Sequence, residues 1–587
     1  MSPGPSNHVA LVEHADATSH AFETRSIAYF SMEIALEPAL PTYSGGLGIL
    51  AGDTLRAAAD LSVPMAGVSL VHRHGYFRQT LNDDGSQSEH PDTWQPEQRL
   101  ELAGSTVTLS IAGRDVHVRA WIYRVRGVSG YEVPVYLLDT DLPENDPQDR
   151  TLTDSLYAGD ARLRLAQEAV LGMAGVQLLR SAGYRIDTYH LNEGHSALLV
   201  LSLLEAELAE GCAFSESLEA VRARCVFTTH TPVAAGHDRF PEGLVREVLG
   251  DQRADLLRAA GAFDSGELNM TDLALRYSRY ANGVAMRHGE VSRKMFPDRE
   301  VRAITNGIHA ATWAAPAFAE LFDRHLPEWR RDNLFLRYAE GIATDEIGAA
   351  HRAAKIALLA LIEARSGVVL LPDVLTIGFA RRATGYKRAN LIFDDVARLA
   401  RIAQHAGPIQ IVYGGKAHPS DEPGKAIIQS IFRAARDLRD DVRVVYLENY
   451  DMALAQYLVP GVDLWLNTPE RPLEASGTSG MKAALNGVPS LSVLDGWWVE
   501  GCIPGVTGWS IGEPDTLDAS NDARSLYDAL DTIVPLFYGS PEKYAQIMRS
   551  SIALNASFFN TQRMVTQYVR NAYAAGERRS AGSTHGL

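Results

Sequence analysis

Cysteine and positive charge are both scarce in this chain. The three cysteines, Cys212, Cys225 and Cys502, are far apart and odd in number, so neither a disulfide framework nor a cysteine metal site is expected, and a reducing compartment is. The 55 Lys and Arg are outnumbered by 72 Asp and Glu, for a formal net charge of −17. Nucleic acids and anionic membranes need a positive surface, so neither is expected as the main partner, whereas a neutral sugar polymer is compatible.

Long apolar runs are missing as well. No window approaches the length of uninterrupted apolar sequence that spans a bilayer, so no membrane segment is predicted. The opening "MSPGPSNHVALVEHADATSH" has neither a basic start nor an apolar centre, which predicts that no signal peptide is present. Together with the few cysteines, this predicts a cytoplasmic location.

Short β-rich runs alternate with longer helical patterns along the chain. Strands are predicted at "DVLTIGFARR", "IQIVYGG", "VRVVYLENY" and "DLWLNTP", and helices at "ARLRLAQEAVLGMAGVQLLRSAG" and "GAAHRAAKIALLALIEARSG". This alternation predicts the α/β class, with parallel sheets covered by helices. One patch, "GSTVTLSIAGRDVHVRAWIYRVRG", alternates like antiparallel strands instead. The stretch from about Phe318 to Gly367 has no strand signal, so we interpret it as a helical linker between two α/β domains.

A glycine-rich turn, "YSGGLGILAGD", precedes a helix that is predicted to start near Leu50. Gly45, Gly46 and Gly48 would let backbone N–H groups come close to a phosphate. Their spacing also fits the dinucleotide fingerprint, but the acid that should follow about 20 residues later is missing. We therefore favour a phosphate or sugar loop over NAD, and the alternative is a glycine turn that closes a tight strand–helix corner.

Four cations, Arg381, Arg382, Lys387 and Arg388, follow the apolar strand "VLTIGFA". Ligands of parallel sheets bind at the carboxyl ends of strands, and arginine can bond a phosphate as a fork. The cluster therefore suits one or two phosphates, and the alternative is a solvated surface run.

The segment "HLNEGH" invites a zinc interpretation, but its spacing matches neither H-E-x-x-H nor H-x-x-E-H, so no metal is predicted. Asn192, Glu193 and His195 make better sense as hydrogen-bonding groups for sugar hydroxyls. The same holds for His230 in "TTHTPVAAGH".

The segment "RPLEASGTSGMKAALNG" places Glu474 and Lys482 eight residues apart. This is the spacing of the E-x7-E element of nucleotide-sugar glycosyltransferases, with lysine in place of the second acid. A helix is predicted from about Gly480, and its dipole disfavours a charged lysine near the N-terminus. A neutral amine, or one used in a Schiff base, avoids that penalty. The alternative is a surface lysine whose amine reaches solvent.

Taken together, these segments resemble the α-glucan phosphorylases, the family of glycogen and maltodextrin phosphorylases. The resemblance runs in order through "YFSMEIALEPALPTYSGGLGILAGD", "HLNEGHSAL", "FTTHTPVAAGHDRF", "ITNGIHAATW", "GFARRATGYKRA", "YLENYDMALA" and "EASGTSGMKAALNG", and covers nearly the whole chain. It implies the GT-B architecture, in which two Rossmann-like domains face each other across a cleft. The expected units are a first domain at residues 1–315, a helical linker at 316–367, and a second domain with a terminal helix at 368–587.

The resemblance also implies roles for individual residues. Lys482 would bind pyridoxal 5′-phosphate as an imine. The other residues of the cofactor site would be Tyr450, Thr478, Ser479 and Gly48. The substrate phosphate would lie beside Gly45 and Gly46 and be bound by Arg382 and Lys387. The residues expected around the glucosyl unit are Asn192, His195, His230, Asn306, Glu474, Ser476 and Gly477, of which His230 is also counted as catalytic.

The chain departs from the family in two respects. Thr384 and Gly385 stand where the muscle-type enzymes have histidine and glutamate, which leaves the contacts of that gate undefined. No match to the N-terminal phosphorylation segment of those enzymes is found, so allosteric control of that kind is not expected.

The implied reaction is reversible phosphorolysis of an α-1,4-glucan or maltooligosaccharide. A terminal glucosyl unit and inorganic phosphate give glucose 1-phosphate, and the phosphate of the cofactor acts as acid and base. A homodimer is expected from the family alone. One alternative is a nucleotide-sugar-dependent glucan synthase, which would be expected to have glutamate at position 482. A second is an inactive glucan-binding protein, but the presence of Lys482, Arg382 and Lys387 argues against it.

Overall fold

A mixed ten-stranded sheet occupies the first half of the chain in the computed structural model, which describes residues 26–157, 159–233, 236–513 and 519–574. The N-terminal segment that was predicted not to be a signal peptide lies outside these residues. The strand order is β15-β14-β10-β9-β1-β2-β8-β7-β5, with β6 beside β7. The strands are β1 Ser26–Ser31, β2 Met65–Leu70, β5 Glu101–Leu102, β6 Val107–Ile111, β7 Arg114–Arg126, β8 Glu132–Asp139, β9 Ile186–Asn192, β10 Cys225–Thr228, β14 Tyr280–Gly283 and β15 Arg302–Ala303.

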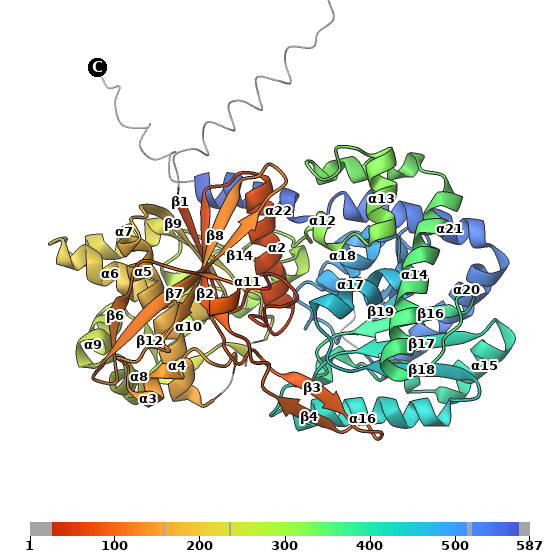
Figure 1. The fold of residues 1–587 in the computed structure, drawn as a ribbon, viewed down its shortest axis with the longest axis horizontal. Helices are drawn as coiled ribbons and strands as arrows, with labels where there is room; N and C mark the ends of the chain where they lie inside the picture. Colours follow the sequence, from red (N-terminus) through yellow and green to blue (C-terminus); the bar gives the residue numbers. More distant parts are fainter. Residues whose placement is uncertain (1–25, 158, 234–235, 514–518, 575–587) are drawn as a thin grey trace, which may run out of the picture.

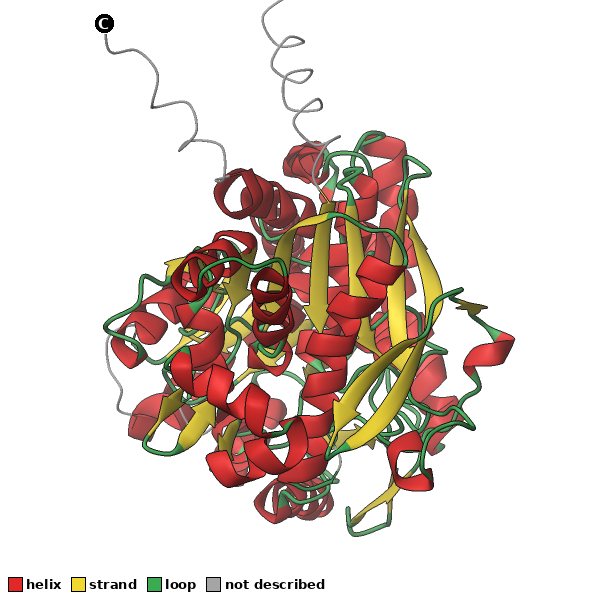
Figure 2. Ribbon diagram, turned by 90° about the vertical axis from the view of Figure 1, so that its left-hand side faces the viewer, coloured by secondary structure: helices red, strands yellow, loops and turns green. Residues whose placement is uncertain are grey.

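The seven strands from β15 to β8 in this order are parallel, and β7 runs antiparallel to β8, β5 and β6. The antiparallel patch predicted from its alternation is therefore confirmed. Its residues alternate between buried and exposed along β7, whereas β1 and β2 are buried almost throughout because helices cover both faces of the parallel part. Figure 2 shows these helices in front of and behind the strands.

A second sheet of six parallel strands lies beside the first (Figure 1). Its order is β18-β17-β16-β19-β20-β21. The strands are β16 Leu375–Ala380, β17 Ile409–Gly414, β18 Val442–Leu447, β19 Leu464–Asn467, β20 Ser490–Val493 and β21 Gly508–Ile511. The α/β class with parallel sheets, predicted from the alternation of strand and helix patterns, is thus confirmed.

Helices connect the strands of both sheets. Those of the first half are α2 Gly46–Asp60, α3 Pro147–Arg150, α4 Ala161–Ala169, α5 Gly175–Ser181, α6 Leu199–Ala209, α7 Phe214–Arg224, α8 Glu242–Leu249, α9 Asp251–Ala259, α10 Met270–Arg276, α11 Met286–Met295 and α12 Ala310–Trp313. Later in the chain come α13 Pro316–His325, α14 Thr344–Ser366, α15 Val396–His405, α16 Glu422–Asp437, α17 Met452–Gly461, α18 Thr478–Leu485, α19 Trp498–Gly501, α20 Asp522–Gly539, α21 Pro541–Ser550 and α22 Thr561–Tyr568. None of the helices in the described ranges is long and apolar enough to cross a membrane.

Two helix starts differ from the predictions. The helix after the glycine turn begins at Gly46 rather than near Leu50, and the helix that carries Lys482 begins at Thr478 rather than at about Gly480. In both places glycines lower the helical propensity of the first turn, but the backbone is helical there because tertiary packing fixes it.

Segments from one half also pack on the other. The terminal helix α22 contributes Met564, Val565 and Tyr568 to the apolar core that lies over β1 and β2. A hairpin of β3 Arg78–Leu81 and β4 Gln87–His90 extends from the first half to α16 in the second (Figure 1). A smaller sheet is formed by β11 Arg239–Pro241, β12 Phe263–Asp264 and β13 Glu267–Asn269.

Candidate functional site

Polar residues gather at the carboxyl ends of parallel strands in the first sheet. Asn192 ends β9 and lies in register with Ser31 at the end of β1, while His230 follows β10 closely. The Asn192 amide donates to Ser31 Oγ at 3.1 Å, and its Oδ1 lies 2.6 Å from His230 Nε2. The structure therefore brings together Asn192 and His230, which the sequence placed with the glucosyl unit.

The histidines of this group are neutral. Burial lowers the pKa of both His195 and His230 to about 3. His195 Nε2 lies 3.5 Å from Asp238, and its Nδ1 has no hydrogen-bond partner among the described residues. A neutral imidazole offers one donor and one acceptor, which matches a sugar hydroxyl without requiring charge.

The first histidine of "HLNEGH" belongs to the packing of the sheet. Both ring nitrogens of His190 are occupied, with Tyr573 Oη at 2.6 Å and Thr228 Oγ1 at 2.9 Å. No group of side chains that could hold a metal ion occurs in the described parts of the chain.

The glycine turn presents the N-terminus of α2. The N–H groups of Ser44 and Gly45 are already used, because they donate to Glu33 Oε2 at 2.6 and 3.1 Å. The N–H of Gly46 opens the first helical turn and has no partner within the helix, and no atom lies within 4 Å of the position that a Cβ on Gly46 would take. An anion can therefore approach Gly46 directly.

Gly48 is required for a different reason. A Cβ there would lie 2.6 Å from Tyr43 Cβ and 2.7 Å from Glu33 Oε2. Its small size lets α2 pack against the segment that carries Glu33, so this contact explains the glycine without any ligand.

Arg382 lies beside the glycine turn although it comes from the other half of the chain. Its Nη2 is 3.8 Å from the position of a Cβ on Gly45. The side chain is exposed, and the structure gives it no hydrogen bond or ion pair with any described residue. A guanidinium without an internal partner next to a helix N-terminus is an arrangement suited to a phosphate group.

Arg381 and Lys387, by contrast, are engaged with Glu474. Both donate to Glu474 Oε2, Lys387 at 2.9 Å, and Arg381 also bonds Asn467. Burial alone would raise the pKa of Glu474, but Arg381 and Lys387 hold it down to about 2, so the carboxylate is ionised. With Arg382, this cluster of three cations and one anion keeps a formal charge of +2 inside a protein of net charge −17.

Asp495 supports the same turn. Its carboxylate accepts the backbone N–H of Glu474 at 2.8 Å and that of Gly496 at 2.9 Å. Burial, with Glu474 nearby, raises the pKa of Asp495 to about 6. The residue thus fixes the backbone that positions Glu474.

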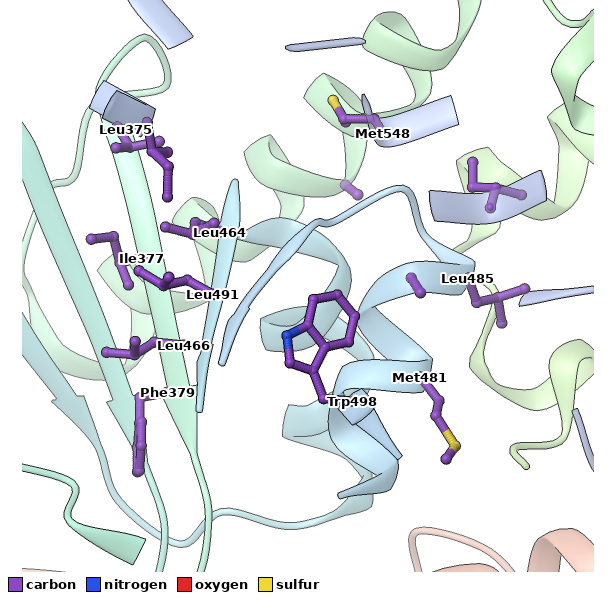
Figure 3. Packing of buried hydrophobic residues seen from close by; sticks show 14 of the residues in the cluster. Leu375, Ile377, Phe379, Leu464, Leu466, Met481, Leu485, Leu491, Trp498 and Met548 are labelled. Carbon is purple, nitrogen blue, oxygen red and sulfur yellow. The ribbon is translucent and has the colours of Figure 1, made fainter. Parts of the chain in front are cut away.

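Lys482 is buried in α18. Met481 and Leu485 on the same helix belong to the buried apolar cluster that also includes Leu464 and Leu491 of the second sheet, and they lie on the side of α18 away from those strands (Figure 3). Only 7% of Lys482 is exposed, and its Nζ lies 3.8 Å from the centre of the Trp313 ring. Over the described residues, the amine has no hydrogen-bond acceptor. Burial lowers its pKa to about 8, Arg56 acts in the same direction, and Asp53 opposes both.

The helix dipole does not act on Lys482 as the sequence predicted. Lys482 is the fifth residue of an eight-residue helix and lies in its last turn, so the dipole no longer penalises its charge. The surface-lysine alternative is contradicted as well, because the side chain is buried. Burial, which the charge of Asp53 offsets only in part, therefore accounts for the lowered pKa of the amine.

Polar groups without a partner among the described residues occur at the start of α18 and at Asn306. Gly477 precedes the helix with φ 91°, a conformation that favours glycine, and no side chain caps the N–H groups of Thr478 and Ser479. Ser476 Oγ and Asn306 Oδ1 are buried and make no hydrogen bond to a described residue. Such atoms cost free energy unless a ligand supplies the bond, so they favour a hydroxylated or anionic ligand here.

Not all of the predicted residues meet. Among the described residues, no hydrogen bond joins Asn192, His195 or His230 to the residues around Glu474 and Lys482. Thr305, next to Asn306 in the chain, does make a bond between the two halves: its Oγ1 donates to Glu500 Oε2 at 2.7 Å. Tyr450 packs its ring against Gly414 at the end of β17. It lies close enough to Arg381 for that charge to act on its pKa, which burial raises.

Two residues that contact the candidate site were not singled out from the sequence. Trp313 under the Lys482 amine lay in the quoted segment "ITNGIHAATW" without being singled out, and Asp495 follows β20 in an unremarkable "VLDG". A carboxylate after a strand was the available signal for Asp495. Nothing in the sequence indicated that Trp313 would cover Lys482, because the two residues lie far apart in the chain.

Comparison with known proteins identifies the family. A family model described as carbohydrate phosphorylase matches residues 32–121 and 252–502, which is more than half of the chain. The chain belongs to the carbohydrate phosphorylase family.

Curated relatives agree over most of their length. Maltodextrin phosphorylase of Thermococcus litoralis is 40% identical, over 93% of this chain and 70% of the relative. Glycogen phosphorylase of Mycobacterium tuberculosis is 38% identical, over 97% and 73% of the two chains, and that of Aquifex aeolicus 36% identical, over 94% and 86%. The resemblance drawn from the sequence motifs is thereby confirmed. The similarity to these phosphorylases extends over most of the chain.

Proposed function

We propose that this member of the family is an α-1,4-glucan phosphorylase. It would transfer a terminal α-1,4-glucosyl unit of a glucan or maltooligosaccharide to inorganic phosphate, reversibly, to give glucose 1-phosphate. The observation that carries the proposal is Lys482, a buried amine with a pKa lowered to about 8 and no hydrogen-bond acceptor among the described residues. Catalysis that uses a lysine as a covalent anchor needs an amine of this kind.

The residues around Lys482 fit pyridoxal 5′-phosphate. When bound, this cofactor supplies an aldehyde that reacts with a primary amine and a phosphate whose second pKa, about 6, allows proton exchange near neutral pH. The Lys482 amine would be the point of attachment, and the uncapped N–H groups of Thr478 and Ser479 would take the anionic group. Tyr450 is proposed to complete the site, and Gly48 to border it through its packing with Glu33.

The substrate phosphate is proposed to lie between Gly45, Gly46 and Arg382. Arg382 would bond it as a fork, and the first turn of α2 would add a backbone N–H. Lys387 and Arg381 are neutralised in part by Glu474, so they would contribute electrostatically and hold that acid in place. Like-charged phosphates that lie close together repel each other, and the formal +2 of this cluster offsets that repulsion.

The glucosyl unit is proposed to contact the neutral polar residues. His230 and Asn192 form one hydrogen-bonded pair for its hydroxyl groups, and His195 adds an unpaired nitrogen. Asn306 and Ser476 offer buried oxygen atoms that make no hydrogen bond to a described residue, while Glu474 and Gly477 lie on the same turn as Ser476. These groups would orient the sugar and exclude water from the reacting centre.

The two sheets also support the finer features expected of the family. We propose the GT-B architecture, with Rossmann-like units at residues 1–315 and 368–587 and a helical linker at 316–367. In addition, α22 near the end of the chain packs back on the first sheet. A homodimer and a cytoplasmic location remain predictions, as do the gating contacts of Thr384 and Gly385.

The two alternatives are not favoured. A glucan synthase that uses a nucleotide sugar would have an acid at position 482, where this chain has a buried lysine over Trp313. An inactive glucan-binding protein would have no need for an unpaired guanidinium at Arg382 or for a buried amine at Lys482, and burial of that amine costs free energy.

One assay separates the three functions. The purified protein is incubated with maltooligosaccharides or glycogen, with and without inorganic phosphate, and glucose 1-phosphate is measured. The expected result is release that depends on phosphate and needs neither a nucleotide nor a metal. Release of nucleotide from a nucleotide sugar would indicate the synthase, and glucan binding without either product would indicate the inactive protein.

A further inference from the structure

The hairpin of β3 and β4 belongs to the first half of the chain but is docked on the second (Figure 1). At its tip, Gln429 of α16 donates to Ser86 Oγ at 3.0 Å, and Phe432 lies against Gly85. Further along, Lys425 of α16 pairs with Glu89 at 3.2 Å. The hairpin is therefore a fixed bridge between the halves.

Gln79 in this hairpin forms hydrogen bonds to two loops of the second half, one at Gly415 and one at Asn449. It is 1% exposed, and its Nε2 donates to the Gly415 carbonyl at 3.0 Å while its Oε1 accepts the Asn449 N–H at 2.9 Å. The Asn449 side chain in turn accepts the Gln79 N–H at 3.1 Å. A glutamine amide can donate and accept at the same time, which this double contact requires.

Gln87 on the neighbouring strand holds only one of these loops. Its Oε1 accepts the Ala417 N–H at 3.0 Å, and its Nε2 donates to the Ala417 carbonyl at 2.9 Å. It also accepts a hydrogen bond from Gln79 Nε2 at 2.8 Å, so the two amides form one network.

The loop at residues 414–417 fixes the backbone on both sides of Arg382. The Arg381 N–H donates to Gly414 O at 3.1 Å, and the Ala383 N–H donates to Lys416 O at 2.9 Å. A Cβ on Gly415 would lie 1.9 Å from the Arg381 carbonyl, which shows how closely the two segments pack. A shift of this loop therefore shifts Arg382.

The second loop ends at Tyr450, which directly follows Asn449. Tyr450 is proposed to hold the cofactor, whereas Arg382 is proposed to bind the substrate phosphate. Gln79 thus bonds both the residue before Tyr450 and the loop that fixes Arg382, whereas Gln87 bonds that loop but not Asn449.

We propose that Gln79 and Gln87 are positioning residues that set Arg382 against the glycine turn, and that Gln79 also sets Tyr450. The proposal rests on the proposed function. Its physical basis is that Gly45 and Arg382 come from different halves, so their separation depends on contacts that cross between the halves. The hairpin supplies such contacts one loop away from Arg382 itself.

The test compares Gln79→Met and Gln87→Met, which keep the length of the side chain but remove its amide. Both variants should raise the apparent KM for phosphate by roughly tenfold, less than the roughly 100-fold that a misplacement of 1 Å can cost. The KM for the glucan should change little. Cofactor content, measured by absorbance, should fall more in Gln79→Met than in Gln87→Met, because only Gln79 bonds Asn449.

The matched control is Gln429→Met, which removes a bond at the tip of the same hairpin but touches neither loop. It should leave the KM for phosphate and the cofactor content unchanged. An equal loss in this variant, or an unchanged KM for phosphate in both test variants, would overturn the proposal. Should Gln79→Met fail to fold, Gln87→Met still tests the connection to Arg382.

A binding measurement separates this proposal from the proposed function. Inorganic phosphate should raise the melting temperature of the wild type, because a ligand that binds the folded state stabilises it, and the rise should be smaller in both variants. A wild type that releases no glucose 1-phosphate would refute the function, whereas an equal rise in the wild type and both variants would refute the positioning role.

Discussion

The two halves of the protein contribute opposite kinds of polar group to the candidate site. In the first half, burial keeps His195 and His230 neutral, with a pKa of about 3, and Asn192 is neutral by nature. In the second half, Glu474 stays ionised with a pKa of about 2 because Arg381 and Lys387 contact it. The difference shows that burial removes charge where nearby opposite charges do not offset desolvation, and that charge survives where two cations contact the buried group. Neutral groups suit hydroxyls, and cations suit phosphate.

The largest expected effect comes from removing the buried amine of the second half. Lys482→Ala should reduce phosphorolysis by about 10²–10⁴-fold or more, the contribution of a positioned proton-transfer group, because the cofactor that supplies it would no longer be anchored. Borohydride reduction of the wild type, followed by peptide mapping, should mark the peptide that contains Lys482. The exposed Lys543→Ala serves as control and should retain full activity. A wild type that is active yet carries no such label would contradict the assignment.

Removal of Arg382 tests the phosphate side of the comparison. Arg382→Ala should lose charge-assisted hydrogen bonds of about 1.5–3 kcal/mol each. At about 1.36 kcal/mol per decade, one such bond corresponds to a factor of roughly 10 to 150. The loss should appear in the apparent phosphate affinity and in turnover, with little change in glucan affinity, and Arg382→Lys should recover only a part.

Initial rates against phosphate at saturating maltodextrin measure this effect, with cofactor content checked for each variant. Arg365→Ala, an exposed arginine at the end of α14, is the control for loss of charge alone. Glucan affinity that falls as much as phosphate affinity would show that Arg382 does not bind the phosphate.

Mild acid should destabilise the first half before the second. His190, His195 and His230 have a folded pKa of about 3 against 6.5 unfolded, so the unfolded chain binds more protons and the stability they contribute is lost as pH falls below 6.5. At pH 5 each would cost about 2 kcal/mol. The stabilisation through Glu474 is lost only as pH falls from 4.5 towards 2.

Hydrogen exchange followed by mass spectrometry at pH 7.5 and 5.0, corrected for intrinsic rates, should therefore show opening around β9 and β10 first. His190→Gln should reduce the pH dependence of the free energy of unfolding. His405→Gln, at an exposed histidine in the second half, is the matched control substitution. Equal opening of both halves at pH 5 would contradict the prediction that the first half is the more sensitive to acid.

The smallest expected effect is that of Ser476→Ala. Its hydroxyl has no partner among the described residues, so the variant should fold with nearly unchanged stability. If the hydroxyl bonds the sugar, the apparent KM for the glucan should rise by roughly 2- to 13-fold, the equivalent of about 0.5–1.5 kcal/mol, and phosphate affinity should stay constant. A change confined to phosphate would move Ser476 to the other side of the comparison.

The sequence by itself determined the class of the fold, the family and the order of the motifs. Periods of apolar residues identified the parallel strands and the antiparallel patch of β6 and β7, because alternation and burial are local properties of a strand. The residue types around Gly45, Arg382 and Lys482 could be read as ligand-binding groups because their chemistry does not depend on packing.

Only the tertiary structure decided which of these groups are already engaged. Lys387 and Arg382 look alike in "RRATGYKR", yet Lys387 pairs with Glu474, 87 residues away, whereas Arg382 has no partner among the described residues. Lys482 was predicted to be unusual from a helix dipole, but its pKa is lowered by burial against Trp313. The physical reason is common to both: charge pairing and desolvation depend on distances between residues that lie far apart in the chain, and those distances exist only once the two sheets, the hairpin and α22 have packed.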